Sequence, residues 1–195
     1  MARECCKRCD FPIVTCLCEA IKPVNNRTKL IVLQHPDEVK NKKNTIKLAK
    51  MACSNIEVFI GESEQDFADI MQTLVNSKTA LLFPSDSATP FDQLASDISF
   101  DYLVILDGTW RKAKRIYFVN PWLKKLPHLQ FALANESQYS IRSTSQEFSL
   151  SSIEAIAYSL EKLENLPPNN LLDLLNAFTV QFTKKMPEHV KQRYQ

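Results

Sequence analysis

The chain has 195 residues, of which 45% are hydrophobic and 24% are charged, a balance that is typical of one globular domain and excludes a disordered chain. The formal net charge is only +2, but residues 1–50 carry 11 basic and 5 acidic side chains, whereas residues 51–100 carry 1 and 8. Two glycines, Gly61 and Gly108, are too few for a G-x-G-x-x-G pattern and too far apart for a P-loop pattern, which excludes the usual Rossmann dehydrogenases and methyltransferases and the P-loop NTPases.

The N-terminus lacks the apolar core of a secretion signal. No apolar run approaches the roughly 18 residues that a membrane span needs. We therefore expect a cytoplasmic protein that contacts no membrane, and no motif indicates an obligate protein partner.

Five of the six cysteines lie within the first 18 residues. Cys6, Cys9, Cys16 and Cys18 form two closely spaced pairs, which can place four thiolates tetrahedrally around zinc. Because cytosolic chains rarely hold disulfides, we favour a structural zinc ion over a disulfide pair or idle thiols. The sequence thus predicts a zinc-binding segment over residues 1–25 and one α/β domain over residues 26–195.

An alternation of strands and helices follows this segment. Short, continuously apolar runs, typical of buried parallel sheets, predict strands at residues 29–34, 57–60, 79–83, 102–107 and 129–133. Apolar residues at helical spacing predict helices at residues 45–53, 66–76, 109–118, 151–163 and 171–182. The predicted fold class is α/β with a mostly parallel sheet, and Cys53 is expected in its core.

Basic side chains gather in two places along the chain. The first group is Lys40, Lys42, Lys43, Lys47 and Lys50, and the second is Arg111, Lys112, Lys114, Arg115, Lys124 and Lys125. If the fold brings the two groups together, they form a phosphate-binding face. Otherwise they are the solvated faces of two helices.

The strongest chemical signal is Asp107-Gly108-Thr109-Trp110, at the end of the predicted strand 102–107. Ligands of open α/β sheets bind outside the carboxyl ends of strands. Asp107 is therefore a candidate catalytic acid, although it could merely cap the next helix. Trp110 is either a core anchor or a ligand platform beside it. Ile105 excludes a dehalogenase-type phosphatase, which needs its nucleophilic Asp at that position.

Two weaker motifs lie elsewhere in the chain. Gln34-His35-Pro36-x-Glu38 follows the first predicted strand. Ser151 and Glu154 have the spacing of a capping box, which leaves room for a ligand at the same helix N-terminus. His128 and His189 suggest no role.

Together the motifs resemble those of DTW-domain proteins, the tRNA-uridine aminocarboxypropyltransferases. In chain order they are Cys6-x-Arg8-Cys9-x-x-Pro12-x-x-x-Cys16-x-Cys18, His35-Pro36-x-Glu38, Asp107-Gly108-Thr109-Trp110 and Leu150-Ser151-x-x-Glu154-Ala155, covering roughly residues 5–185. The chain departs from the family at residues 143–148, where many members have a basic residue and a proline.

The resemblance implies that S-adenosylmethionine donates its 3-amino-3-carboxypropyl group to N3 of a tRNA uridine and leaves as methylthioadenosine. It also implies a SPOUT-like fold whose C-terminal knot holds this donor. The implied donor-binding residues are Phe83, Pro84, Ser85, Leu106, Gly108, Thr109, Trp110, Leu133, Ile141, Arg142, Leu150 and Ser151.

In this implied site Asp107 is the general base for the uridine imide, and Arg142 pairs with the donor carboxylate. The expected tRNA contacts are Lys43, Lys47, Arg111, Lys112 and Arg115. Two alternatives stay open, a non-catalytic zinc-containing RNA-binding protein and a SPOUT-type RNA methyltransferase. The acid at the strand end favours an enzyme, because a pure binder has no need of it.

Overall fold

The continuously apolar runs of the sequence form one parallel sheet. A computed structural model describes residues 4–95, 97–131 and 150–184. The six strands in this part of the chain lie in the order β2-β1-β5-β3-β6-β4, each parallel to its neighbours. They are β1 (Lys29–Gln34), β2 (Ile56–Ile60), β3 (Thr79–Leu82), β4 (Thr89–Pro90), β5 (Tyr102–Asp107) and β6 (His128–Gln130).

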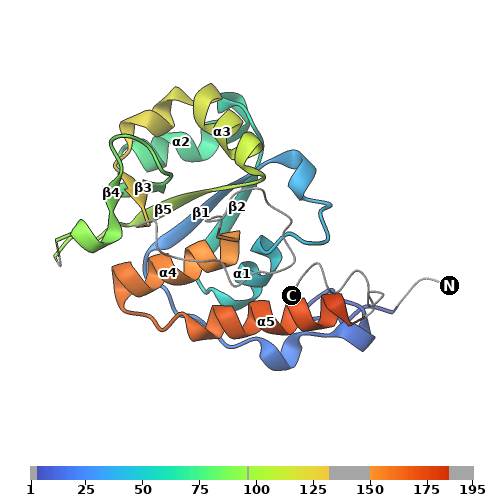
Figure 1. The fold of residues 1–195 in the computed structure, drawn as a ribbon. Coiled ribbons are helices and arrows are strands. Elements are labelled where there is room, and N and C mark those ends of the chain that lie inside the picture. The colour runs from blue at the N-terminus through green and yellow to red at the C-terminus, as the bar shows by residue number, and fades with distance from the viewer. Residues whose placement is uncertain (1–3, 96, 132–149, 185–195) are drawn as a thin grey trace.

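Helices cover both faces of this sheet, which gives three layers (Figure 1). The α-helices are α1 (Ile46–Ala52), α2 (Ala68–Val75), α3 (Trp110–Val119), α4 (Ser152–Glu164) and α5 (Asn169–Thr183). One core cluster joins α1, α4 and α5 to one face, and a second joins α2 and α3 to the other. Because both faces are covered, Leu30 and Leu103 and their strand neighbours are fully buried. Among the described residues, no helix has the length and apolar character to cross a membrane.

The predicted α/β class and parallel sheet are confirmed. The strands predicted at 29–34 and 102–107 match β1 and β5 to the residue, and each predicted helix appears with its ends moved by at most two residues. β6 covers His128–Gln130 instead of residues 129–133, of which 132 and 133 lie outside the described residues. β4 is absent from the prediction, because a two-residue strand with a proline has no apolar run. Cys53 is buried directly after α1, as expected.

The cysteine-rich N-terminal segment packs along α5 (Figure 1). The ring of Phe11 meets that of Phe178 edge to face, with centroids 5.8 Å apart. Leu17 is buried in the core cluster beneath α5, and the Lys22 ammonium lies 3.0 Å from the Asp173 carboxylate. The division into residues 1–25 and 26–195 stays a prediction.

Candidate functional site

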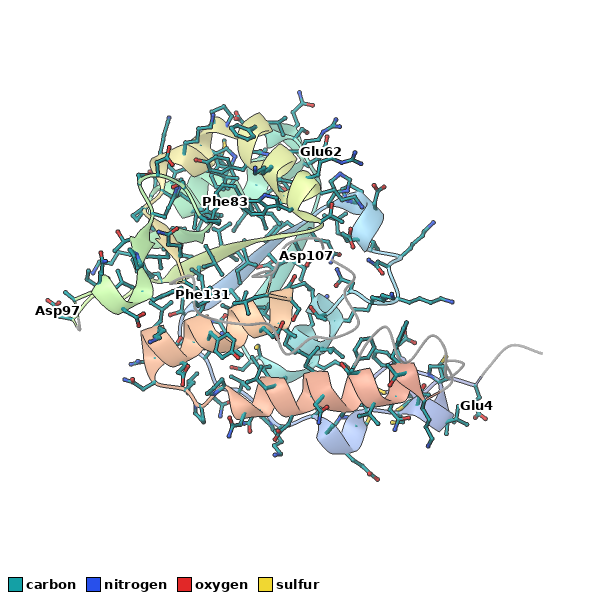
Figure 2. The ribbon with its side chains drawn as sticks, in the orientation of Figure 1. Glu4, Glu62, Phe83, Asp97, Asp107 and Phe131 are labelled. Carbon is teal, nitrogen blue, oxygen red and sulfur yellow. The ribbon has the colours of Figure 1, made fainter. Side chains whose placement is uncertain are left out.

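The polar residues singled out in the sequence meet at the carboxyl edge of the sheet. Gln34 ends β1 and Asp107 ends β5, and the two residues are direct neighbours in the register of these strands. Figure 2 shows Asp107 between the two helical layers, with Phe83 on the side of α2 and α3. Since Phe83 directly follows β3, which pairs with β5, its loop reaches the same edge. This is where open α/β sheets bind their ligands.

Asp107 is the centre of a buried hydrogen-bond network. Its side chain is 2% exposed. The amides of Gln34 and Asn44 both donate to Oδ2, from 2.8 and 2.6 Å, and the Ser152 hydroxyl donates to Oδ1. The carboxylate therefore ties the end of β1 and the segment before α1 to the first residue of α4.

These three partners were not found by sequence reasoning. Gln34 gave the clearest signal, as a polar residue directly after four buried apolar ones in β1. Asn44 and Ser152 gave none of their own, because they lie 63 and 45 residues away from Asp107 in the chain.

The capping box at the start of α4 is confirmed. The Ser151 hydroxyl donates to Glu154 Oε2 over 2.6 Å and accepts from the Glu154 backbone N–H, and the Ser151 N–H donates to the same carboxylate over 2.7 Å. Both side chains are fully buried. The box fixes the first turn of α4, and with it Ser152 beside Asp107.

The residues after Asp107 turn the chain into α3. Gly108 packs closely, because a Cβ added there would lie 3.0 Å from the Cβ of Lys112 and 3.6 Å from that of His35. Thr109, and not Asp107, caps α3, because its side chain accepts the N–H of Lys112. A side chain at 108 would therefore press on the first turn of α3 and on the turn after β1.

Trp110 is not a buried core anchor, since it is 38% exposed. One side of its indole stacks on Phe83, with centroids 5.4 Å apart and planes 19° apart. Phe83 in turn stacks on Tyr117 at 4.2 Å. The indole is therefore held at the sheet edge by a buried aromatic stack.

Two of the expected tRNA contacts are engaged in ion pairs. The Lys112 ammonium lies 2.9 Å from Glu38 and 3.3 Å from Asp37, and the hydrogen bond to Glu38 raises the pKa of Lys112. Arg115 Nε lies 2.7 Å from Glu62, whose other oxygen accepts from His35 Nε2 over 2.7 Å. These pairs connect the turn after β1 and the loop after β2 to α3.

The other expected tRNA contacts differ in setting. Arg111 and Lys47 are exposed. The Lys43 ammonium lies 5.8 Å from the centre of the Phe182 ring. Because α1 and α3 cover opposite faces of the sheet, Lys47 and Arg111 lie on different helical layers (Figure 1).

We expect Lys112→Met to destabilise the protein by about 1–3 kcal/mol, because it leaves the buried Glu38 carboxylate without its ammonium partner. Urea denaturation measures this loss. Lys114→Met is the matched control on the same helix, since Lys114 is exposed, and it should change stability by less than about 0.5 kcal/mol. Adding Glu38→Gln to Lys112→Met should recover part of the loss. If Lys112→Met and Lys114→Met were equally stable, the structural role of Lys112 would be contradicted.

His128, which suggested no role in the sequence, is buried beside the loop after β3. Its Nε2 lies 3.0 Å from the Leu123 carbonyl oxygen, which can only accept, so Nε2 carries the hydrogen. In the neutral ring, Nδ1 then accepts from the Ser85 hydroxyl over 2.6 Å. This contact fixes the hydroxyl of a residue in the implied donor loop.

The implied donor-binding residues are spread over these loops. Phe83 and Ser151 are buried, Ser85, Leu106, Gly108 and Leu150 are half-buried, and Pro84, Thr109 and Trp110 are exposed. Leu133, Ile141 and Arg142 lie outside the described residues.

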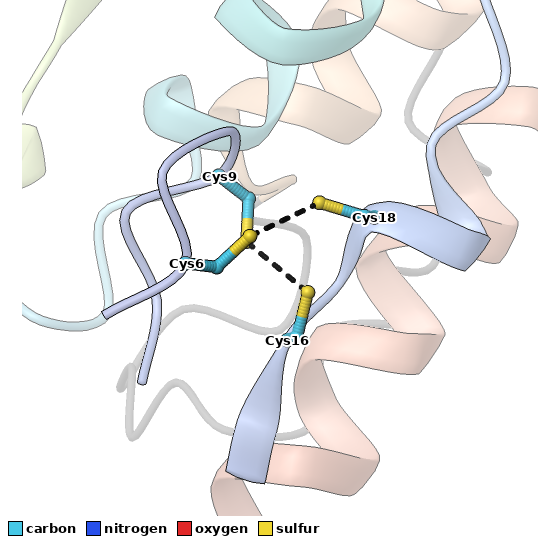
Figure 3. A group of neighbouring side chains, drawn as sticks. All are labelled: Cys6, Cys9, Cys16 and Cys18. Carbon is cyan, nitrogen blue, oxygen red and sulfur yellow. Dashed lines mark hydrogen bonds between the residues drawn. The ribbon is translucent and has the colours of Figure 1, made fainter. Parts of the chain in front are cut away.

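The four cysteines of the predicted zinc site come together (Figure 3). The sulfur atoms of Cys6, Cys9, Cys16 and Cys18 all lie within 4.8 Å of one another. Cys6 and Cys18 are 3.5 Å apart, and Cys9 and Cys16 are 3.7 Å apart. Four thiolates around a zinc ion with bonds of about 2.3 Å lie about 3.8 Å apart, so the group fits a tetrahedral ion.

The backbone at this cluster favours thiolate. The N–H groups of Cys9 and Arg8 point to the Cys6 sulfur and lower its pKa to about 6. Burial and the neighbouring thiols raise the pKa of Cys18 to about 12. A zinc dication among the four sulfurs would offset the repulsion between neighbouring thiolates.

The chain matches the family model of the DTW domain over residues 3–184. It is 31% identical, over 85% of its length, to tRNA-uridine aminocarboxypropyltransferase 2 of Drosophila melanogaster, and 30% identical, over 82%, to the protein of that name in Mus musculus. The chain spans 68% of the Drosophila relative and 56% of the mouse one. No solved structure matches it significantly.

Proposed function

Because the chain belongs to the DTW domain family, we propose that it is a tRNA-uridine aminocarboxypropyltransferase. The observation that carries this proposal is the position of Asp107, a carboxylate at the carboxyl edge of the sheet, within a family match that spans residues 3–184. The names of the relatives supply the substrate class and the transferred group.

S-adenosylmethionine is the proposed donor. The N3 of a tRNA uridine attacks the carbon that joins the aminocarboxypropyl group to sulfur. The N–C bond forms as the C–S bond breaks, and the bonding electron pair goes to sulfur, which leaves as the neutral thioether methylthioadenosine. The imide proton passes to a base. Since the sulfonium has three electrophilic carbons, the site must select one of them by orientation.

Asp107 is the proposed base, and its hydrogen bonds indicate which oxygen acts. Oδ2 is held by two amides, whereas Oδ1 has the Ser152 hydroxyl as its partner. Each carboxylate oxygen can accept two hydrogen bonds, so Oδ1 has room for an imide N–H beside the Ser152 hydroxyl, whereas Oδ2 already accepts two amides. We therefore assign the proton transfer to Oδ1.

The donor is proposed to bind in loops that follow β3 and β5 and lead into α4, in a SPOUT-like fold with a C-terminal knot. Support comes from the meeting of Phe83, Trp110 and Ser151 at one sheet edge, without any glycine-rich loop. The contacts proposed for Leu133, Ile141 and Arg142, including a pairing of Arg142 with the donor carboxylate, lie outside the described residues.

Zinc is the proposed occupant of the four-cysteine cluster, with a structural role. Four protein thiolates would leave no open position for catalysis. In addition, the cluster lies on the segment that packs along α5, whereas Asp107 lies at the sheet edge (Figure 2).

tRNA phosphates are proposed to bind at Arg111, Lys43 and Lys47, and at Lys112 and Arg115 if these exchange carboxylate partners for phosphates. Basic side chains near a sheet edge would also attract the negatively charged RNA over several ångströms.

The deciding experiment incubates the protein with tRNA and S-adenosylmethionine and then measures the mass of the digested nucleosides. A uridine that gains an aminocarboxypropyl group supports the proposal. A gain of one methyl group would support a methyltransferase instead, and tRNA binding without any mass change would support a non-catalytic RNA-binding protein. Asp101→Asn, at the opposite end of β5, is a suitable active control.

A further inference from the structure

The solvent side of α3 carries large rings and ammonium groups in alternation. Trp110, Lys114 and Phe118 follow each other at four-residue spacing, which places them on one side of the helix. Phe118 is 60% exposed. Over eight residues the two rings are about 12 Å apart along the axis. Residues Trp110–Val119 contain no acidic side chain.

An ammonium group lies over each of these exposed rings. Lys114 Nζ is 5.1 Å from the centre of the Trp110 ring, and Lys124 Nζ is 5.3 Å from that of Phe118. Within the described part of the chain, no carboxylate oxygen lies within 4.0 Å of either ammonium. The two charges thus stay available to an anionic ligand.

Contacts with other aromatic rings fix the orientation of both exposed rings, Trp110 against Phe83 and Phe118 against Tyr117. Ala113, Ile116 and Tyr117 form the buried side of α3. Tyr117 contacts Phe83 face to face and Phe118 edge to face, with centroids 4.2 and 5.4 Å away. A base that stacks on either ring has to displace the ammonium above it toward a phosphate, but the ring itself loses little freedom.

Exposed rings interleaved with unpaired cations are the combination that binds single-stranded nucleic acid, because bases stack on rings while phosphates meet cations. Paired bases are already stacked and cannot use such rings. We propose that this face, formed by Trp110, Lys114, Phe118 and Lys124 and termed the α3 stacking face, binds unpaired nucleotides of the RNA substrate. That the RNA is a substrate rests on the proposed function, whereas the arrangement of rings and ammonium groups does not.

The test compares binding of two synthetic RNAs with equal numbers of phosphates, a hairpin with a single-stranded loop and a fully paired duplex. Phe118→Leu keeps an apolar side chain but cannot stack, and we expect about 5- to 100-fold weaker hairpin binding with little change for the duplex. Phe118→Tyr should restore hairpin binding. Val180→Leu, at an exposed apolar position of α5, is the control and should change neither.

Tryptophan fluorescence gives a second measurement. The chain has two tryptophans, and Trp122 is 4% exposed. Stacking of a base on Trp110 should quench emission with the hairpin but not with the duplex, and Trp110→Phe should abolish this response. Lys114→Gln and Lys124→Gln should each lower the salt slope of hairpin binding by about one, whereas Lys78→Gln, at the opposite sheet edge, should not.

Unchanged hairpin affinity of Phe118→Leu, or an equal loss for hairpin and duplex, would overturn the stacking face. The nucleoside assay separates this result from a failure of the proposed function. If the wild-type protein forms no aminocarboxypropyl product while Phe118→Leu still weakens hairpin binding, only the function fails. If the product forms while Phe118→Leu binds the hairpin normally, only the stacking face fails.

Discussion

Asp107→Asn is expected to lower the single-turnover rate of uridine modification by about 100- to 10,000-fold, with donor and tRNA both saturating. An amide cannot accept the imide proton, so the loss falls on the chemical step. Binding of donor and tRNA should change much less.

The hydrogen-bond partners of Asp107 can also bind an asparagine, so this substitution is expected to preserve the fold. Gln34 and Asn44 both donate to Oδ2, which the carbonyl oxygen of an asparagine can replace. At the Oδ1 position the new amide can donate to the Ser152 oxygen, because a hydroxyl both donates and accepts. The variant should therefore fold with a melting temperature near that of the wild type.

Two controls separate a base from a purely structural carboxylate. Ser152→Ala removes the partner of Oδ1 but leaves the carboxylate, so it should retain most of the rate. Asp101→Asn removes an exposed carboxylate at the other end of β5 and should behave as wild type. Near-normal turnover of a stable Asp107→Asn protein would refute the assignment of Asp107 as the base.

Cys9→Ser is expected to remove the zinc ion and to release the N-terminal segment from α5. Cys9 is the buried member of the four-sulfur group, and its hydroxyl replacement is a poor zinc ligand. Metal analysis should find about one zinc per wild-type chain and much less in the variant. Limited proteolysis should then cut within residues 5–25, since Phe11 and Leu17 lose the fold that presses them onto the domain.

Cys5→Ser is the matched control, because Cys5 is an exposed neighbour outside the four-sulfur group. It should keep zinc and protease resistance. Removing zinc from the wild type with a chelator should reproduce the Cys9→Ser pattern, and added zinc should reverse it. Wild-type protein purified without chelators and free of zinc would contradict the prediction.

Features of the fold and of the candidate site could be predicted from the sequence where their residues lie close together in the chain. β1 and β5 are found to the residue because strands buried on both faces must be continuously apolar. The cysteine cluster is found because its ligands lie within 13 residues of one another, Cys6 to Cys18, and their spacing alone sets the geometry.

The parts missed are side-chain contacts between distant segments. Asp107 stands out by its place after an apolar strand, but its partner Asn44 is fixed only by the strand order, which puts β5 beside β1. In the same way Lys112 looks like a free phosphate ligand in the sequence, and only the fold brings Glu38 to it. Local patterns contain no information on such pairings.

The strand order also determines when the protein can become complete during synthesis. β1 can pair on its inner side only after β5 has been synthesised, because the residues paired at the ends of these strands, Gln34 and Asp107, are 73 positions apart. The N-terminal segment waits longer still, because Phe11 and Lys22 pack on Phe178 and Asp173 of α5. The cysteine-rich segment thus reaches its final place only after α5 has been made, and a nascent chain that stalls before α5 exposes Leu17 to other molecules. A nascent chain that stalls before β5 also exposes the inner edge of β1.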